Sequence, residues 1–131
     1  MTPQTSVAAA RAQQVGLVCV ILGETLRKAG QLTAKQCFTH NISTRRREDH
    51  VLVTTGVYRY VRHPGYLGWL IWAVGTQVML ANPVSIALFA YTSWRFFAAR
   101  IAFEEAALRR FFGAAYDAYA ARTRTWIVGI P

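Results

Sequence analysis

The chain has 131 residues, of which 53% are hydrophobic and 16% are charged, and 15 Lys and Arg against 6 Asp and Glu give a net charge of +9. Average soluble domains carry about 25% charged residues, so this chain is both more apolar and more basic than they are. The apolar content excludes a disordered chain, and the length accommodates one domain. A nucleic-acid-binding domain does not usually combine this charge with this apolar content. The composition therefore points first to a membrane.

The first predicted element is a helix over 7–28. Its charge-free stretch at 12–23 holds the apolar cluster Val15–Leu22. This segment fits either a marginal transmembrane helix or a helix that packs against the hairpin described below. It does not have the pattern of a cleaved signal peptide, because a helical pattern continues through 24–28, where a small-residue cleavage site belongs.

Residues 31–62 are predicted to form a loop, because they are largely polar and lose helical periodicity. They include the arginine triplet 45–47, which either anchors the chain at the cytoplasmic side of a membrane or lies in an ordinary solvated loop. A short β-prone run, Val51–Thr55, ends at Gly56.

The longest charge-free stretch, Pro64–Trp94, contains no Asp, Glu, Lys or Arg. One membrane-spanning helix needs about 20 apolar residues, so this stretch is too long for a single helix. Pro83 falls near its middle, and the residue before a proline is biased away from helix. We therefore predict a helical hairpin over 65–97, with arms at Gly65–Leu80 and Val84–Phe97. A buried hairpin of a soluble α protein is the alternative.

Two further helices are predicted at 95–122. The first, Arg95–Phe112, would leave the membrane and end at Gly113, since glycine is favoured at helix C-termini. The second is a short amphipathic helix at Ala114–Arg122, followed by the apolar tail Thr123–Pro131. These elements predict an all-α, integral membrane fold in a single domain, 1–131.

Ionisable groups in or beside a membrane are costly, so they are functional candidates. His63 lies at the mouth of the hairpin, where Pro64 at the first helical position leaves free backbone N–H groups for an anion; a solvated cap is the alternative. Arg100 and Glu104 are four residues apart and share a helix face, where a surface ion pair is the alternative. No metal site is predicted, because the 3 histidines lack metal-ligand spacing, and no G-x-G-x-x-G fingerprint occurs.

Taken together, these motifs resemble the isoprenylcysteine carboxyl methyltransferase family. The resemblance covers about 23–122 and rests on the order and spacing of several motifs. The Arg-His-Pro stretch alone is shared by several membrane methyltransferases and reductases, whereas the flanking motifs make the match specific. The motifs that carry it are His50–Tyr58, Arg62–Trp69, Glu104–Glu105 and Phe111–Tyr116.

The resemblance implies a multi-pass enzyme of the endoplasmic reticulum membrane with its active site facing the cytosol. It would use S-adenosyl-L-methionine to methylate the C-terminal carboxylate of a farnesylated or geranylgeranylated cysteine. Its partners would be prenylated, CAAX-processed proteins and membrane lipid, with no nucleic acid. The cofactor pocket would be formed by the loop and the cytosolic-side helices, and it would not be a Rossmann pocket.

By position, the resemblance implies catalytic roles for Arg100, which would hold the substrate carboxylate, and for Glu104. A carboxylate is already ionised at pH 7, so the reaction needs positioning and exclusion of water rather than a general base. The residues implied to bind the cofactor are His50, Val51, Leu52, Val53, Tyr58, His63, Pro64, Gly65, Tyr66 and Glu104.

The chain departs from the family at two places. Ser43 stands where the family often has a glutamine that touches the cofactor. Relatives also have additional membrane helices before the equivalent of Val7, so we expect either a minimal or truncated form, or a lipid pocket completed in another way. Three other functions remain open: a phospholipid methyltransferase, a sterol-type membrane reductase that uses NADPH, and a truncated membrane module without turnover.

Overall fold

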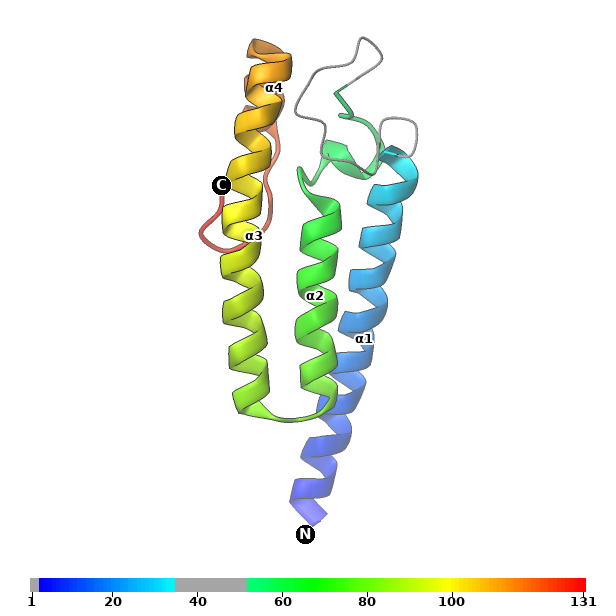
Figure 1. Cartoon of the computed structure of the whole chain (residues 1–131). Helices are drawn as coiled ribbons and strands as arrows, with labels where there is room; N and C mark the ends of the chain where they lie inside the picture. The colour runs from blue at the N-terminus through cyan, green and yellow to red at the C-terminus, as the bar shows by residue number, and fades with distance from the viewer. Residues whose placement is uncertain (1–2, 35–51) are drawn as a thin grey trace.

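The computed structural model describes residues 3–34 and 52–131 (Figure 1). It contains no strand within these residues, which confirms the prediction of an all-α fold. The elements in chain order are α1 (Pro3–Ala34), the 3-10 helix η1 (Gly56–Arg59), α2 (Pro64–Met79), α3 (Pro83–Phe112) and α4 (Ala114–Arg122).

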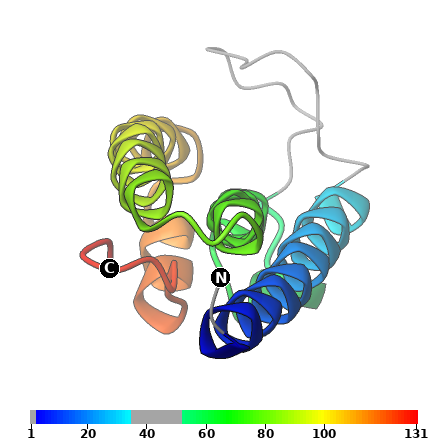
Figure 2. The ribbon, with the colours of Figure 1, turned by 90° about the horizontal axis from the view of Figure 1, so that it is seen from below.

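Three long helices stand side by side in one row, with α2 in the middle (Figures 1 and 2). Consecutive helices are antiparallel. The first residues of α2 therefore lie at the same end of the bundle as the last residues of α1 and α3 (Figure 1). After α3 the chain turns back, and α4 and the C-terminal segment, Thr125–Pro131, lie on one side of the row (Figure 2). The functional candidates His63, Arg100 and Glu104 are therefore all brought to the same end of the molecule.

Helices α1 and α2 approach until their backbones touch. The buried residues Gly16, Gly23 and Gly30 lie seven residues apart on α1, and Gly68 and Gly75 face them from α2. A Cβ atom at Gly23 would lie 2.6 Å from the carbonyl oxygen of Gly68, and one at Gly68 would lie 2.5 Å from the carbonyl oxygen of Gly23. Glycine is the residue that permits such close helix packing, as in membrane helix pairs.

The opposite face of α1 is apolar and exposed, with Val15, Val18, Ile21 and Leu22 among its exposed side chains. Over Gln4–Ala34, α1 is the one helix in the described ranges that is long and apolar enough to cross a membrane. It also packs against α2. The two alternatives offered by the sequence, a membrane-spanning helix and a helix packed against the hairpin, are therefore compatible in α1. One helix of this kind does not by itself establish a membrane protein.

The turn of the hairpin agrees with the role predicted for Pro83. The Asn82 side chain caps α3 by accepting from the backbone N–H groups of Val84 and Ser85 at 3.1 and 3.3 Å. The helix then continues without a break to Phe112, so the second arm of the predicted hairpin and the helix at 95–112 are one element. It ends at Gly113, which takes a positive φ of 55°.

The prediction of a loop at 31–62 is wrong at its start, because α1 continues to Ala34. The extension is held by tertiary contacts: a Cβ atom at Gly30 would lie 2.9 Å from Pro64, and one at Gly56 would lie 3.1 Å from Thr33. The β-prone run forms no strand over its described part, 52–55, because no neighbouring strand pairs with it there. Its first residue, with Cys37, Ser43, the arginine triplet and His50, lies outside the described residues.

The variant Gly23→Leu is expected to separate α1 from α2, because its side chain would overlap the backbone of α2. Overpacking of this kind costs about 1–3 kcal/mol, so the thermal unfolding temperature in detergent should fall by several degrees. Ala10→Leu is the matched control, since it introduces the same side chain at an exposed position of the same helix. Equal unfolding temperatures for the two variants would contradict the backbone contact.

Candidate functional site

His63 forms the centre of the candidate site. It precedes the first residue of α2 and is only 8% exposed. Its Nε2 lies 3.1 Å from Oε1 of Glu105, and its Nδ1 lies 4.0 Å from Oε2 of Glu104. Two consecutive residues of α3 thus reach opposite nitrogens of one imidazole, and the burial of His63 excludes the alternative of a solvated cap.

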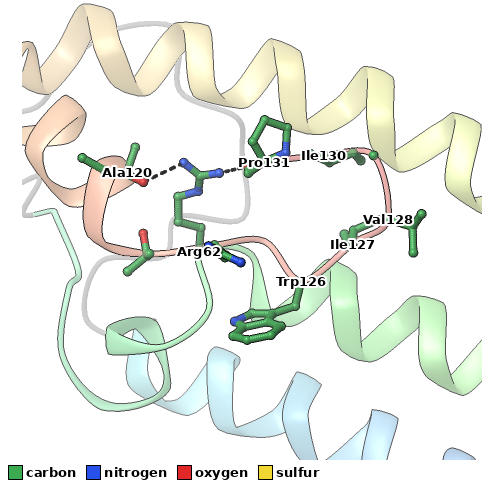
Figure 3. Close-up of a pocket in the computed structure, with 11 residues that line it drawn as sticks. Arg62, Ala120, Trp126, Ile127, Val128, Ile130 and Pro131 are labelled. Carbon is green, nitrogen blue, oxygen red and sulfur yellow. Dashed lines mark hydrogen bonds between the residues drawn. The ribbon is translucent and has the colours of Figure 1, made fainter.

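Arg62, next to it, is a buried cation that joins separate parts of the chain (Figure 3). Its Nε lies 3.3 Å from Oε1 of Glu105, and its Nη1 donates to the Ala120 carbonyl at 3.3 Å. Its Nη2 donates to the carbonyl oxygen of Pro131. Buried charges require such partners. Because its backbone N–H also donates to the Arg124 carbonyl at 3.0 Å, Arg62 holds the C-terminal segment against the start of α2.

An open cavity of about 780 Å³ lies beside Arg62, between the end of α4 and the C-terminal segment (Figure 3). Its walls include Thr123, Trp126 and Ile130. None of the predicted catalytic or cofactor-binding residues lines it, so it is separate from the predicted site.

Glu105 is the shared anion of this end of the molecule, with a side chain only 12% exposed. It pairs with both Arg62 and His63, and Nη2 of Arg109 lies 4.0 Å from its second oxygen. The buried Tyr116 of α4 lies beside it. Burial, and then the negative charge of Glu105, raise the pKa of the Tyr116 hydroxyl, so this group stays protonated next to the carboxylate.

Tyr119, one turn further along α4, connects that helix to η1. Its hydroxyl donates to the Tyr58 carbonyl oxygen at 2.7 Å, and burial raises its pKa to about 12. A neutral phenol can keep donating this hydrogen bond throughout the physiological pH range. Tyr58, a predicted cofactor-binding residue, is thereby fixed from its main-chain side.

Arg100 is linked to His63 by the side chain of Tyr66, which contacts both residues. Its Nε donates to the Tyr66 hydroxyl at 3.3 Å, and the Tyr66 ring stacks on His63 with centroids 5.6 Å apart. The same ring packs against Phe97 at 5.0 Å. No ion pair within 4.0 Å joins Arg100 to Glu104 in the part of the chain that the structure describes. Arg100 is therefore oriented by Tyr66 rather than by Glu104.

The structure thus brings four predicted residues into one cluster: His63, Tyr66, Arg100 and Glu104. Of the other predicted cofactor-binding residues, Pro64 and Gly65 form the first turn of α2, Leu52 and Val53 lie in the segment before η1, and Tyr58 lies in η1. His50 and Val51 lie outside the described residues.

Sequence reasoning missed the structural roles of Arg62, Glu105 and Tyr116. A signal for Glu105 was present, because it continues the spacing of Phe97 and Ile101, which lie four residues apart on the buried face of α3. A charged residue on an apolar helical stripe needs a buried partner. The Arg62 and His63 side chains supply that partner.

Comparisons with known proteins identify the family to which the sequence is similar. Residues 15–110 match the family model described as the isoprenylcysteine carboxyl methyltransferase family. A protein-S-isoprenylcysteine O-methyltransferase B of Arabidopsis thaliana is 55% identical over 116 residues, which cover 88% of this chain and 57% of that protein. The Dictyostelium discoideum protein-S-isoprenylcysteine O-methyltransferase is 47% identical over 116 residues, covering 88% and 49%.

The structural comparison agrees. The chain is similar to a solved structure of the eukaryotic intramembrane Ras methyltransferase ICMT, with a TM-score of 0.86 and 39% sequence identity, over 98% of this chain and 53% of that one. Together with the apolar helix α1, this similarity indicates a membrane protein. The chain spans about half the length of the relatives it matches.

Replacing Glu105 by alanine is expected to destabilise the fold, because it leaves Arg62 and His63 without their shared anion. Removal of one partner from a buried ion pair costs about 3–5 kcal/mol, which denaturant unfolding in mixed micelles would measure. Asp117→Ala is the control: it removes the partner of Arg109 in an ion pair of 3.1 Å whose side chains are exposed, and such pairs contribute about 0–1 kcal/mol. Similar losses for the two variants would contradict a special role for Glu105.

Proposed function

Since the chain belongs to the isoprenylcysteine carboxyl methyltransferase family, we propose that it transfers a methyl group from S-adenosyl-L-methionine to the C-terminal carboxylate of a prenylated cysteine. Curated relatives at 44–57% identity are named protein-S-isoprenylcysteine O-methyltransferases. The observation that carries the proposal is the cluster of His63, Tyr66, Arg100 and Glu104, in which a half-buried guanidinium stands beside a half-buried carboxylate.

The residues at the start of α2 fit the polar groups of the proposed methyl donor. A Cβ atom at Gly65 would meet nothing within 4 Å, so the space beside the first turn is open. The first backbone N–H groups of a helix lack partners within the helix and favour an anion, such as the carboxylate of the donor. Glu104, which faces His63 and the Tyr66 hydroxyl, would accept from the ammonium or hydroxyl groups of the donor.

When bound, the donor supplies an electrophilic methyl group on a sulfonium. The chain's own task is then to hold the acceptor carboxylate in line, because the carboxylate is already ionised and needs no base. Arg100 suits this task, since a guanidinium can bind both oxygens of a carboxylate with its planar fork of donors. Its Nε is engaged by Tyr66, which fixes the direction of the fork and leaves its terminal nitrogens for the substrate.

We further propose that α1 crosses the membrane of the endoplasmic reticulum, that the α2–α3 hairpin is embedded in it, and that the site end faces the cytosol. Basic residues gather at this end, whereas the opposite end carries Arg11 on α1 and has no basic residue at the turn, 80–84, as expected for an excess of positive charge on the cytosolic side. The basic residues of the site end include Arg59, Arg62, Arg100, Arg109, Arg110, Arg122 and Arg124.

The partners under this proposal are prenylated, CAAX-processed proteins and membrane lipid. The whole chain, 1–131, acts as one catalytic core.

The relatives described above are named for neither a phospholipid methyltransferase nor a reductase. A thermal unfolding assay separates the reductase from the proposal: S-adenosyl-L-methionine should raise the unfolding temperature and NADPH should not. Protection by NADPH alone would favour the reductase.

Arg100→Ala is expected to lower kcat/KM for methylation of N-acetyl-S-farnesylcysteine by roughly 100-fold, because the acceptor carboxylate loses its positioning group. Labelled methyl transfer by the chain in lipid nanodiscs would measure this, and labelled methyl transfer to a phospholipid would be measured in parallel. Arg110→Ala is the control, since it removes an exposed arginine from the same helix. Full activity of Arg100→Ala would remove Arg100 from the proposed role, and donor binding without turnover by the unsubstituted chain would indicate a non-catalytic module.

A further inference from the structure

The C-terminal segment, defined here as Thr125–Pro131, folds back beside α3 (Figure 1). Its start is held at the level of the site, where Val61 bridges to Arg124. Its far turn is held lower on α3, because the Trp94 indole donates to the Val128 carbonyl oxygen at 2.6 Å. A Cβ atom at Gly129 would also lie 3.4 Å from the Trp94 ring, so two contacts fix the turn beside Trp94.

One residue on each of the three long helices shows where this level lies. Arg95, next to Trp94, precedes Glu104 by nine residues, which places it about 14 Å along the helix axis from the site. On α2 this level corresponds to Trp69, whose ring packs against Phe97 at 5.2 Å. On α1 it corresponds to Arg27, whose backbone N would lie 2.7 Å from a Cβ atom at Gly68.

This level has the composition of a membrane surface. Tryptophan and arginine are typical of the boundary between headgroups and acyl chains, and both occur there, as Trp69, Trp94 and Arg95. Beyond it α2 carries no charge up to the hairpin turn, so the hydrocarbon layer begins at this level. The turn of the C-terminal segment therefore reaches the boundary, whereas the site cluster lies outside the hydrocarbon.

The side chains of the C-terminal segment suit this boundary. The segment has no charged residue. Ile127 is buried against Phe97 and Ile101, while Val128 is 87% exposed and points away from Arg62 (Figure 3). Trp126 is 64% exposed.

The backbone of the segment is also prepared for a poorly hydrated environment. The Ile130 N–H donates to the Ile127 carbonyl at 3.0 Å, and the Ile127 N–H donates to the Thr125 hydroxyl oxygen at 3.3 Å. The Thr125 hydroxyl donates to the Ile130 carbonyl. Irregular backbone near hydrocarbon requires this kind of internal pairing.

The conformation of Trp126 shows that its exposed position is actively held. Its φ is +60°, in the left-handed region that is unfavourable for a bulky residue. The indole nitrogen donates to the Tyr60 carbonyl oxygen at 2.9 Å, which holds the ring in this position. An amphipathic ring with its N–H satisfied and its faces exposed is suited to a membrane interface.

We propose that the C-terminal segment is a membrane-interface anchor whose apolar turn, with Val128 at its tip, inserts at the headgroup–acyl boundary beside Trp94. The partner is the lipid of the leaflet nearest the site. This proposal rests on the membrane arrangement given under Proposed function. It assigns the segment two tasks: it attaches to lipid, and through Arg62 it ties that attachment to the start of α2.

Single-cysteine variants test the depth of the segment in nanodiscs, with Cys19 and Cys37 replaced by alanine. Val128→Cys, labelled with bimane, should be quenched by lipids that carry a spin label near the headgroup, and less by lipids that carry it near the bilayer centre. Leu88→Cys is the deep control, exposed on α3 and seven residues nearer the hairpin turn than Arg95; it should show the reverse preference. Asp117→Cys, in α4 and 63% exposed, should be quenched by neither.

Absence of lipid quenching at Val128→Cys, with normal quenching at Leu88→Cys, would overturn this proposal alone and would indicate that water or another protein segment covers the turn. Strongest quenching from the bilayer centre would overturn the boundary depth. If Leu88→Cys is also unquenched, the membrane arrangement itself fails, and this proposal fails with it. Methyl transfer by the same preparations reports separately on the proposed function.

Discussion

The contact between the backbones of α1 and α2 is the constraint on which the remaining structure depends. Because glycines occupy both sides of it, no side chain separates the helices, and a shift of either helix would bring its neighbours into overlap. This contact fixes the alignment of α1 and α2 along their whole shared length, up to the site. The last glycine of the series, Gly30, lies against Pro64, the first residue of α2. The position of His63 is therefore set by α1, a helix that contributes no side chain to the cluster.

The position of α3 depends on charge instead of close backbone packing. Glu105 is held by Arg62 and His63 within 3.3 Å, and this pairing fixes the height of α3 beside α2. A buried ion pair adds little net stability but tolerates few alternative arrangements, so its main contribution here is registry. With Glu105 engaged in this way, the neighbouring Glu104 and the nearby Arg100 remain half-buried and available to ligands.

Much of the architecture could be predicted from the distribution of charge and proline, and the rest required spatial information. The charge-free stretch and Pro83 indicate the hairpin, the cost of ionisable groups beside a membrane indicates His63, Arg100 and Glu104, and the family resemblance adds Tyr66. The glycine series at 16, 23 and 30 is visible in the sequence, but a search for apolar periodicity does not register small residues. The C-terminal segment offers no local signal, because its shape depends on Trp94, which lies 34 residues before Val128.

The proposed chemistry gives a reason for the distance between the charged cluster and the membrane boundary. A prenylated cysteine has an ionised carboxylate at one end and a long apolar chain at the other. Arg100 lies five residues beyond Arg95 on α3, which corresponds to about 8 Å along the helix. A carboxylate held there stays hydrated enough to remain charged until it is bound, while its prenyl chain can still enter the hydrocarbon. A cluster placed deeper would have to desolvate the carboxylate first, at a cost of several kcal/mol, so the boundary is the level at which both ends of the substrate can be accommodated.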